Sequence, residues 1–416
     1  MKTDVVVIGG GASGLIAALN AAEQGASVLL LDKNAKLGRK LRITGKGRCN
    51  LTNECEVNEM LRHIPGDGRF LYSALTAFQP QDTIAFFEQN GLPLKTERGK
   101  RVFPQSDRAD DVADLLIRLC KNAGVSIRQG CVSELSFQNG AMNGVLIDDQ
   151  LIKCTCCVVC TGGMSYPLTG STGDGYRFAE SAGHQIAALR PSLVPLESPD
   201  PCCQRLQGLS LKNVAVRIYE DERLLCSDQG EMLFTHFGVS GPLVLSASAR
   251  MLHWDRCNYR MEIDLKPALD ERKLDDRLLR DLAKYRNRDF RHALGELAPQ
   301  SLIPELIRIS GIPADLKANS VTKEMRRKLL CAFKAFPVPL SGTRPWAEAI
   351  ITAGGVCTKE LNPRSMESKL VSGLFFAGEV LDLDAYTGGF NLQIAWSTGR
   401  LAGISAGKKS KKAERE

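Results

Sequence analysis

The chain begins with three apolar segments whose lengths and spacing predict a strand, a helix and a second strand. Val5–Ile8 and Val28–Leu31 are apolar runs of strand length, and Ile16–Ala22 between them is apolar over nearly two helical turns. This order is typical of two parallel strands joined by a crossover helix. We therefore expect an α/β fold.

Three glycines separate the first predicted strand from the helix, at the spacing G-x-G-x-x-G. Gly9 allows a tight turn, Gly11 lets the backbone approach a pyrophosphate, and Gly14 lets the helix pack closely on the strand. The helix N-terminus offers free N–H groups to phosphates, and Asp32 after the second strand can accept ribose hydroxyls. The pattern predicts a dinucleotide site; the alternative is a glycine-rich turn that binds nothing.

A second strand–turn–helix pattern near the end of the chain indicates which dinucleotide is bound. Residues 373–379 are apolar and end in Gly378 and Glu379, and residues 387–403 place glycines, Gly389 among them, before an apolar helix. FAD-binding folds of the glutathione-reductase type use such a late segment, whose helix N-terminus faces the flavin ring. We therefore expect FAD; the alternative is an ordinary strand–turn–helix.

Between these two patterns the chain predicts helices and a group of short strands. Apolar positions recur at helical spacing in residues 82–90 and 107–123, and Ser106 or Asp107 can cap the second helix. A further helix opens near Asp174, after a loop that could pass over a cofactor. Strands are expected at Val125–Arg128, Val132–Phe137, Gly144–Asp148 and Leu151–Cys160.

An insertion separates the two halves of the expected cofactor domain. Its first part is β-rich with one helix that begins at Pro242, and its second part is helical and highly charged. The sequence thus predicts a Rossmann-like FAD-binding domain interrupted by a β-barrel-like domain and a helical insert. The expected boundaries are 1–190 with 340–407 for the FAD-binding domain, 191–266 for the β-rich substrate domain, 267–339 for the helical insert and 408–416 for a basic disordered tail.

Composition is that of an ordinary globular protein, with 44% apolar and 24% charged residues among 416. The sequence has no apolar run of about 18 residues, which a membrane-spanning helix would need. It also enters the first strand without a signal-peptide pattern. We expect a cytoplasmic protein whose 14 cysteines are reduced, and the oligomeric state stays open.

Four cysteines of one predicted strand resemble a metal site at first sight. Cys154, Cys156, Cys157 and Cys160 lie in the segment IKCTCCVVCTGG. An extended strand sends alternate side chains to opposite faces, so four thiolates on it do not converge on one ion. We expect these cysteines to be small buried side chains, and we expect no metal.

The net charge of +7 is concentrated in short basic segments. Residues 33–48 hold seven basic and no acidic residues, and a second cluster contains Lys323, Arg326, Arg327 and Lys328. Beside a cofactor pocket, the first segment predicts contacts with FAD phosphates, an NADPH phosphate or a polyanionic substrate. The second cluster and the basic tail are either solvated surface or contacts for an RNA backbone.

Five sequence blocks in one order give the chain a family resemblance. They are GRKLRITGKGRCNLTN (38–53), TGGMSYPLTGSTGDG (161–175), THFGVSGPLVLSAS (235–248), ITAGGV (351–356) and GLFFAGEVLDLDAYTGGFNLQIAWSTG (373–399). With them the chain resembles, over nearly its whole length, the BaiN/RdsA-type family of NAD(P)/FAD-dependent oxidoreductases. The resemblance implies tightly bound FAD, reduced by NAD(P)H, in a two-dinucleotide-binding-type domain.

The resemblance also implies which residues contact FAD. Many relatives have Glu where this chain has Asp32, and the shorter carboxylate can still reach a ribose. Together with the glycines of the two motifs, the implied cofactor-binding residues are Gly9, Gly11, Ser13, Gly14, Asp32, Lys33, Arg39, Lys40, Gly45, Asn50, Val132, Gly378, Glu379, Gly389, Asn391 and Leu392.

Members of such a family are associated with reduction of activated C=C bonds, in uridine of large-subunit (23S) ribosomal RNA or in unsaturated bile-acid intermediates. Both reactions need a hydride at one carbon and a proton at its neighbour, and therefore a general acid. A nearby cation would favour the thiolate of Cys49, although this residue could instead simply pack under the flavin. Arg42, Lys46 and Arg48 could polarise a carbonyl or stabilise anionic flavin. The candidate acids are Cys49, Lys46, Tyr386 and His236, the last of which is more simply a buried histidine.

Three functions remain open from the sequence. A reductase of ribosomal RNA is favoured by the basic segments, and we adopt it as the main hypothesis. A small-molecule enone reductase needs only a closed apolar pocket, and a flavoprotein that binds RNA without catalysis is the third possibility. Because the chain has no second G-x-G-x-x-G domain, NAD(P)H is expected as a transient reductant that visits the flavin and leaves, giving ping-pong kinetics.

Overall fold

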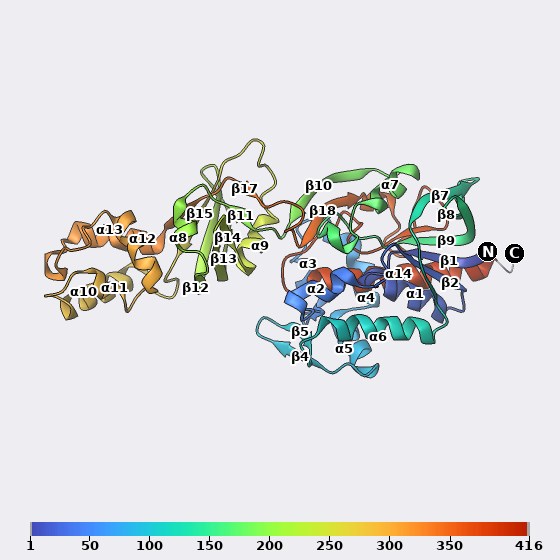
Figure 1. The fold of residues 1–416 in the computed structure, drawn as a ribbon, viewed down its shortest axis with the longest axis horizontal. Coiled ribbons are helices and arrows are strands. Elements are labelled where there is room, and N and C mark those ends of the chain that lie inside the picture. The colour runs from blue at the N-terminus through green and yellow to red at the C-terminus, as the bar shows by residue number, and fades with distance from the viewer. Residues whose placement is uncertain (1, 414–416) are drawn as a thin grey trace. The chain divides into compact units, whose positions relative to one another are not determined.

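The computed structural model describes residues 2–413, which form two compact units (Figure 1). The first unit joins the described residues up to Ser192 with those from Pro345 onward, and the second is Leu193–Arg344. The chain therefore leaves the first unit once and returns to it once. The mixed α/β class expected from the sequence is confirmed.

A seven-stranded sheet is the centre of the first unit, in the order β6-β2-β1-β9-β8-β7 with β19 beside β9. β6, β2, β1, β9 and β19 pair in parallel. β8 pairs antiparallel with β9, and β7 pairs antiparallel with β8. The predicted strand–helix–strand start is confirmed, because Val7 of β1 pairs with Leu30 of β2 in parallel. The strands are β1 (Lys2–Ile8), β2 (Val28–Asp32), β6 (Ser126–Gln129), β7 (Val132–Gln138), β8 (Ala141–Ile147), β9 (Gln150–Val159) and β19 (Leu374–Phe376).

Glycines bring the first and last helices into backbone contact. Helix α1 (Ala12–Glu23) lies along α14 (Phe390–Ala413), and Gly399, Gly403 and Gly407 of α14 recur at the spacing of one helical turn. A Cβ atom built on these glycines would lie 2.4, 2.3 and 2.9 Å from backbone oxygens of α1. No side chain fits between the two helices, and the chain's two ends therefore share one core.

The remaining elements of the first unit cover this sheet or extend from its edges. The helices predicted at 82–90 and 107–123 are confirmed as α5 and α6. The predicted N-cap of α6 is wrong, because the Asp107 carboxylate instead accepts hydrogen bonds from Lys95 and Arg48, both at 2.6 Å. These elements are α2 (Arg39–Gly47), β3 (Thr52–Asn53), α3 (Val57–Leu61), α4 (Tyr72–Ala77), α5 (Pro80–Gln89), β4 (Leu94–Glu97), β5 (Arg101–Pro104), α6 (Ala109–Asn122), α7 (Asp174–Ser181), β10 (Ile186–Ser192) and β18 (Ile351–Val356).

The second unit combines a seven-stranded sheet with helices around one hydrophobic core. Strand β16 follows the helices in sequence and pairs with β15, so the sheet of this unit includes strands from both sides of the helical segment. Pro242 begins α9, as predicted. The elements are β11 (Leu196–Glu197), α8 (Pro201–Arg205), β12 (Ser210–Glu220), β13 (Arg223–Thr235), β14 (Gly238–Ser240), α9 (Pro242–Ser248), β15 (Tyr259–Asp264), α10 (Glu271–Lys284), α11 (Arg291–Leu294), α12 (Ile303–Ser310), α13 (Lys323–Lys334), β16 (Phe336–Pro339) and β17 (Gly342–Thr343).

The structure differs from the sequence prediction of a disordered tail. Residues 408–413 continue α14, and residues 414–416 lie outside the described part of the chain. Lys409 pairs with Glu367 and donates a hydrogen bond of 2.8 Å to Ser372, and Lys411 lies 3.0 Å from a carboxylate oxygen of Asp4. These contacts to residues distant in sequence hold the basic segment as helix.

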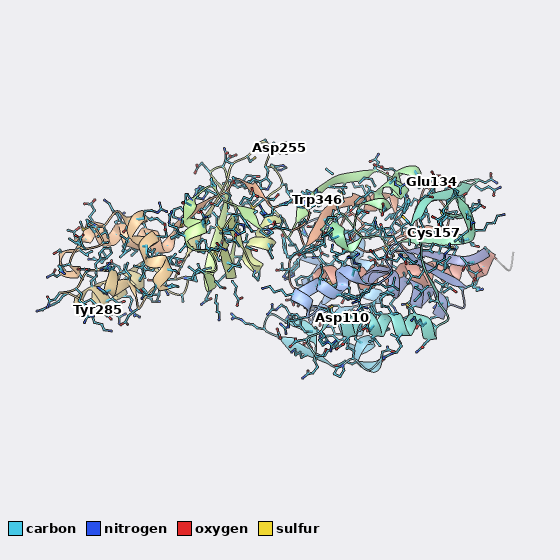
Figure 2. All side chains as sticks on the ribbon, viewed as in Figure 1. Asp110, Glu134, Cys157, Asp255, Tyr285 and Trp346 are labelled. Atoms are coloured by element: carbon cyan, nitrogen blue, oxygen red, sulfur yellow. The ribbon has the colours of Figure 1, made fainter. Side chains whose placement is uncertain are left out.

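The four clustered cysteines are buried along β9 and at its end, and Figure 2 labels Cys157 among them. Burial raises the pKa of Cys154, Cys156 and Cys160 to about 12. Within residues 2–413 no group of three or more His, Cys, Asp or Glu side chains could hold a metal ion. In the same part of the chain, no helix is both long enough and apolar enough to span a membrane.

Candidate functional site

In the first glycine turn, Gly9 and Gly14 pack against backbone atoms, whereas Gly11 faces open space. Gly9 has φ +102°, and a Cβ on it would lie 2.4 Å from the carbonyl oxygen of Cys160. A Cβ on Gly14 would lie 1.8 Å from the oxygen of Gly9, whereas a Cβ on Gly11 would meet no atom within 4 Å. The open space lies at the N-terminus of α1, whose first N–H groups have no partner inside the helix. This arrangement fits a pyrophosphate.

Asp32 is held at the carboxyl end of β2 by backbone groups. Its two carboxylate oxygens accept hydrogen bonds of 2.7 Å, one from the N–H of Gly10 and one from the N–H of Asn34. The N–H of Gly130 donates to the carbonyl oxygen of Asp32 at 2.9 Å, which brings the start of β7 at Val132 close to this carboxylate. The end of β2 and the segment that leads into β7 are therefore joined beside the glycine turn, while a role of Asp32 and Val132 in cofactor binding stays a prediction.

Glu379 is the centre of a network at the second glycine pattern. Its carboxylate accepts hydrogen bonds from Lys40 at 2.6 Å, from the Ser165 hydroxyl at 2.7 Å and from the N–H of Thr352 at 3.0 Å. The Lys40 and Glu379 side chains are only 21% and 15% exposed. The sequence singled out both charged residues but missed Ser165 and Thr352, which lay within family blocks without a role.

Residues 161–173 form a loop that lies against the basic segment. Lys33 pairs with Asp174 at 2.6 Å, and the side chain of Asn34 donates to the carbonyl oxygen of Thr169 at 3.2 Å. Arg39 in turn donates to the side-chain oxygen of Asn34 at 2.8 Å. Lys33 and Arg39, predicted as FAD contacts, are therefore also held by protein groups.

The two arginines further along the segment have acidic partners on α6 and around β4. Arg42 pairs with Asp110 and Asp114, and Figure 2 labels Asp110 on α6. Arg48 pairs with Glu97 and Asp107. Its guanidinium carbon also lies 4.2 Å from the centre of the Phe103 ring. Both arginines are thus neutralised within the first unit.

Left-handed backbone is concentrated in residues 45–49, beside Arg48. Gly45, Lys46, Gly47 and Cys49 have φ values of 57°, 60°, 83° and 60°. A positive φ is unfavourable for the non-glycine residues Lys46 and Cys49. The Lys46 side chain is exposed, and nothing in residues 2–413 provides it with a hydrogen-bond or ion-pair partner.

The prediction of a reactive Cys49 thiolate is wrong. Cys49 is fully buried, and this burial raises the pKa of its thiol to about 12. Arg48 does not offset the effect, because its guanidinium is paired with Glu97 and Asp107. At neutral pH the thiol is protonated, which suits a packed residue rather than a nucleophile.

Two asparagines at the predicted cofactor positions have different surroundings. The side-chain oxygen of Asn50 is buried and has no hydrogen-bond partner within the described residues. A buried acceptor without a donor is costly, so this atom fits a ligand that donates. The Asn391 side chain exchanges two hydrogen bonds with the backbone of Ala385, at 2.6 and 2.9 Å, and thereby fixes the start of α14, where Leu392 is half-buried.

The two remaining candidate acids lie in different units. Tyr386 precedes α14 in the first unit, and its N–H donates to the carbonyl oxygen of His63 at 3.0 Å. Gly389, three residues later, has φ +99°, and a Cβ on it would lie 2.4 Å from the oxygen of Thr52. His236 belongs to the second unit and is exposed, so the expectation of a buried histidine is wrong.

These features define a class of protein. A parallel sheet, a glycine turn open at a helix N-terminus, an acidic residue after β2 and a second glycine turn before α14 form a Rossmann-type dinucleotide-binding site. The open space at Gly11 and the unpaired oxygen of Asn50 both fit a bound dinucleotide.

Comparison with known proteins identifies the family. The family described as HI0933-like protein Rossmann domain matches residues 3–405, and the chain belongs to it. A 3-dehydro-bile acid delta(4,6)-reductase of Clostridium scindens is 31% identical over 97% of this chain and 98% of its own length. A ribosomal RNA dihydrouridine synthase of Escherichia coli is 31% identical over 95% of this chain and 96% of its own.

A solved structure gives the same fold. It is the 3-ketosteroid-delta4-(5alpha)-dehydrogenase from Rhodococcus jostii RHA1, with a TM-score of 0.51, 16% identity, and coverage of 98% of this chain and 97% of that one. The expected family and fold class are confirmed. The protein is an oxidoreductase of this family, and its Rossmann-type site fits FAD as the cofactor.

Proposed function

We propose that this protein uses NAD(P)H to reduce an activated C=C bond, with uridine of 23S ribosomal RNA as the substrate and dihydrouridine as the product. The observation that carries the proposal is the pair of relatives named above, which match nearly the whole chain. Uracil and an unsaturated 3-oxo steroid share one reactive group, a C=C bond conjugated to a carbonyl. Reduction of such a conjugated C=C bond is therefore common to the reactions that both names describe. If the substrate is ribosomal RNA, the reaction takes place in the cytoplasm.

The cofactor residues expected from the sequence take different roles in this proposal. Gly9, Gly11, Ser13 and Gly14 present the N-terminus of α1 to the pyrophosphate, and Asp32 with Val132 receives the adenosine. The segment around Asn50 and the start of α14 hold the flavin end. Around the site lie Lys33, which pairs with Asp174, Lys40, which pairs with Glu379, and Arg39, which donates a hydrogen bond to Asn34. Gly45, Gly378, Gly389, Asn391 and Leu392 would shape the backbone. Bound FAD would supply the hydride.

Lys46 is the proposed acid. Of the seven basic residues in 33–48, the other six contact protein groups, and Lys46 alone has no partner among the described residues. Its ammonium can stabilise negative charge on the substrate carbonyl. It can also give a proton to the carbon next to the one that receives the hydride. Buried Cys49 and paired Arg48 do not fulfil this role, and Tyr386 remains the alternative donor.

The reductant is proposed to use the same site as the substrate. The described residues contain one parallel sheet with one G-x-G-x-x-G turn, and the second unit is built on antiparallel pairs. NAD(P)H would then bind, transfer its hydride and leave before the substrate enters. Initial rates should give parallel lines in double-reciprocal plots, and intersecting lines would contradict this order.

The first experiment is nucleoside mass spectrometry of large-subunit ribosomal RNA from strains with and without the gene. Loss of dihydrouridine, restored by the wild-type gene, is the expected result. Complementation with a variant carrying Gly11→Val, which fills the open space at the pyrophosphate position, is the matched control and should fail to restore it. An unchanged nucleoside profile would refute the RNA substrate.

A small unsaturated ketone is the second candidate substrate, favoured by the bile-acid reductase relative. Salt separates the two candidates. Turnover of RNA should fall steeply with added salt because phosphate contacts release counterions, whereas turnover of a neutral enone should barely change.

A further inference from the structure

A groove follows one face of α13 in the second unit. It has a volume of about 440 Å³, and Ile309, Ala332, Ala335 and Pro337 give it an apolar floor. Arg327, Lys328 and Cys331 follow Glu324 by three, four and seven residues. These side chains therefore lie on one face of the helix and form a continuous stripe. The opposite stripe of α13, which includes Leu329 and Phe333, is buried in the core.

Two cations stand at this groove. Arg327 and Lys328 line it together with one acid, Glu324. The neighbouring Arg326 faces elsewhere, because it pairs with Asp275 at 2.5 Å and only 13% of its side chain is exposed. The groove therefore carries a net positive charge above an apolar floor.

Neither cation is firmly held by the protein. The Lys328–Glu324 pair is 3.4 Å long, and its side chains are 60% and 81% exposed. Such exposed pairs contribute little, so an incoming anion can replace Glu324. Arg327 is exposed, and the described part of the chain offers it no ion-pair partner.

We propose that this groove binds the backbone of the RNA substrate, an inference that rests on the proposed function. Arg327 and Lys328 contact phosphates, while the apolar floor receives a base or a ribose. The basic segment 33–48 supplies few such contacts, because its charges are paired internally. Charge complementarity thus favours the groove as an RNA contact provided by the second unit.

A cysteine inside the groove allows a direct test. Cys331 lines the groove and is exposed, and Cys131 in the first unit is the other exposed cysteine among residues 2–413. Alkylation of the full-length holoenzyme is followed by mass spectrometry, with and without protein-free large-subunit ribosomal RNA. When the RNA concentration is about tenfold above the Kd of the complex, only roughly one tenth of the protein is free. The alkylation rate of Cys331 should then fall roughly tenfold, whereas the alkylation rate of Cys131 should not change.

Variants test the cations themselves. Arg327→Ala with Lys328→Ala should raise the KM for RNA on the order of tenfold at low salt and should lower the salt slope by about 1.4. The kcat, and the reduction of ferricyanide by NAD(P)H, should stay unchanged. The control pair is Arg272→Ala with Arg280→Ala, two exposed arginines on α10 that do not line the groove.

The outcomes separate this inference from the proposed function. RNA binding with protection of Cys331 but no dihydrouridine would refute the function and keep the groove. Dihydrouridine formation with equal alkylation of Cys331 in both conditions would refute the groove alone. Protection of Cys331 without RNA, increasing with protein concentration, would assign the groove to a second copy of the chain and also overturn the inference.

Discussion

Replacement of Lys46 by glycine should make the protein more stable and less active. Lys46 has φ +60°, and a left-handed conformation costs a non-glycine residue roughly 1–2 kcal/mol. Glycine removes that cost but loses about 0.5–1 kcal/mol more backbone entropy on folding. Because the Lys46 side chain has no partner in the described structure, nothing else is lost. The expected gain is therefore about 0.5–1 kcal/mol, or roughly 2 °C in Tm.

The assay compares Lys46→Gly with Lys46→Ala. Alanine keeps the strained backbone, so Lys46→Ala should match the wild type in Tm, whereas Lys46→Gly should exceed both. If Lys46 gives the proton, kcat should fall by about 10²–10⁴ in both variants while FAD absorbance is retained. Lys36→Ala, which removes an exposed lysine of the same segment, serves as the control with normal kcat. Wild-type kcat in the Lys46→Gly variant would refute a role for this ammonium.

Three further predictions concern packing, the buried thiol and acid stability. Gly403→Ala places a Cβ 2.3 Å from the Ala17 oxygen and should lower the free energy of unfolding by about 1–3 kcal/mol, seen as a lower Tm. The control variant Gly66→Ala places its Cβ in open space and should keep the wild-type Tm. Equal Tm values for the two variants would contradict the α1–α14 contact. Cys49→Ser should keep most turnover, because the thiol of Cys49 is protonated; abolished turnover with FAD still bound would restore a chemical role. The pairing with Arg205 lowers the pKa of Glu305 to about 2, so its stabilising effect is present above pH 4.5 and lost as pH falls toward 2. Glu305→Gln should therefore flatten the acid limb of a stability–pH curve, and an unaltered limb would disprove the assignment.

Local patterns predicted the cofactor end of the fold well, for a physical reason. The glycine turn, Asp32 and the apolar strands act through neighbours a few residues away, so their spacing alone encodes the structure. Pairing across long distances in sequence is invisible to such patterns. Lys40 meets Glu379, Arg42 meets Asp110, and Lys409 meets Glu367 only after the chain has folded.

The same distinction explains the errors at single residues. The sequence left two roles open for Cys49, a thiolate favoured by its neighbour Arg48 or a packed side chain, and burial together with the acids around Arg48 favours the packed side chain. The predicted tail was assigned from its basic and polar composition, although Glu367 pairs with Lys409 and Asp4 pairs with Lys411. Charge in a sequence therefore gives the number of cations, and only the fold shows which of them remain available.

That distinction changes how the positive charge of this protein relates to an RNA substrate. The densest basic segment is also the one whose cations are most fully paired, so it serves mainly to hold α2 and the loop 161–173 in place. Lys46 is its exception, and the backbone strain at that position is tolerated without any compensating contact in the described structure. Backbone strain of this kind is often found at ligand sites, and we propose contact with the substrate as the role of Lys46. If Lys46 meets the substrate while Arg327 and Lys328 meet its phosphates, loss of Lys46 should lower kcat and loss of the groove cations should raise KM, and a reversal of these two effects would show that the division of roles is wrong.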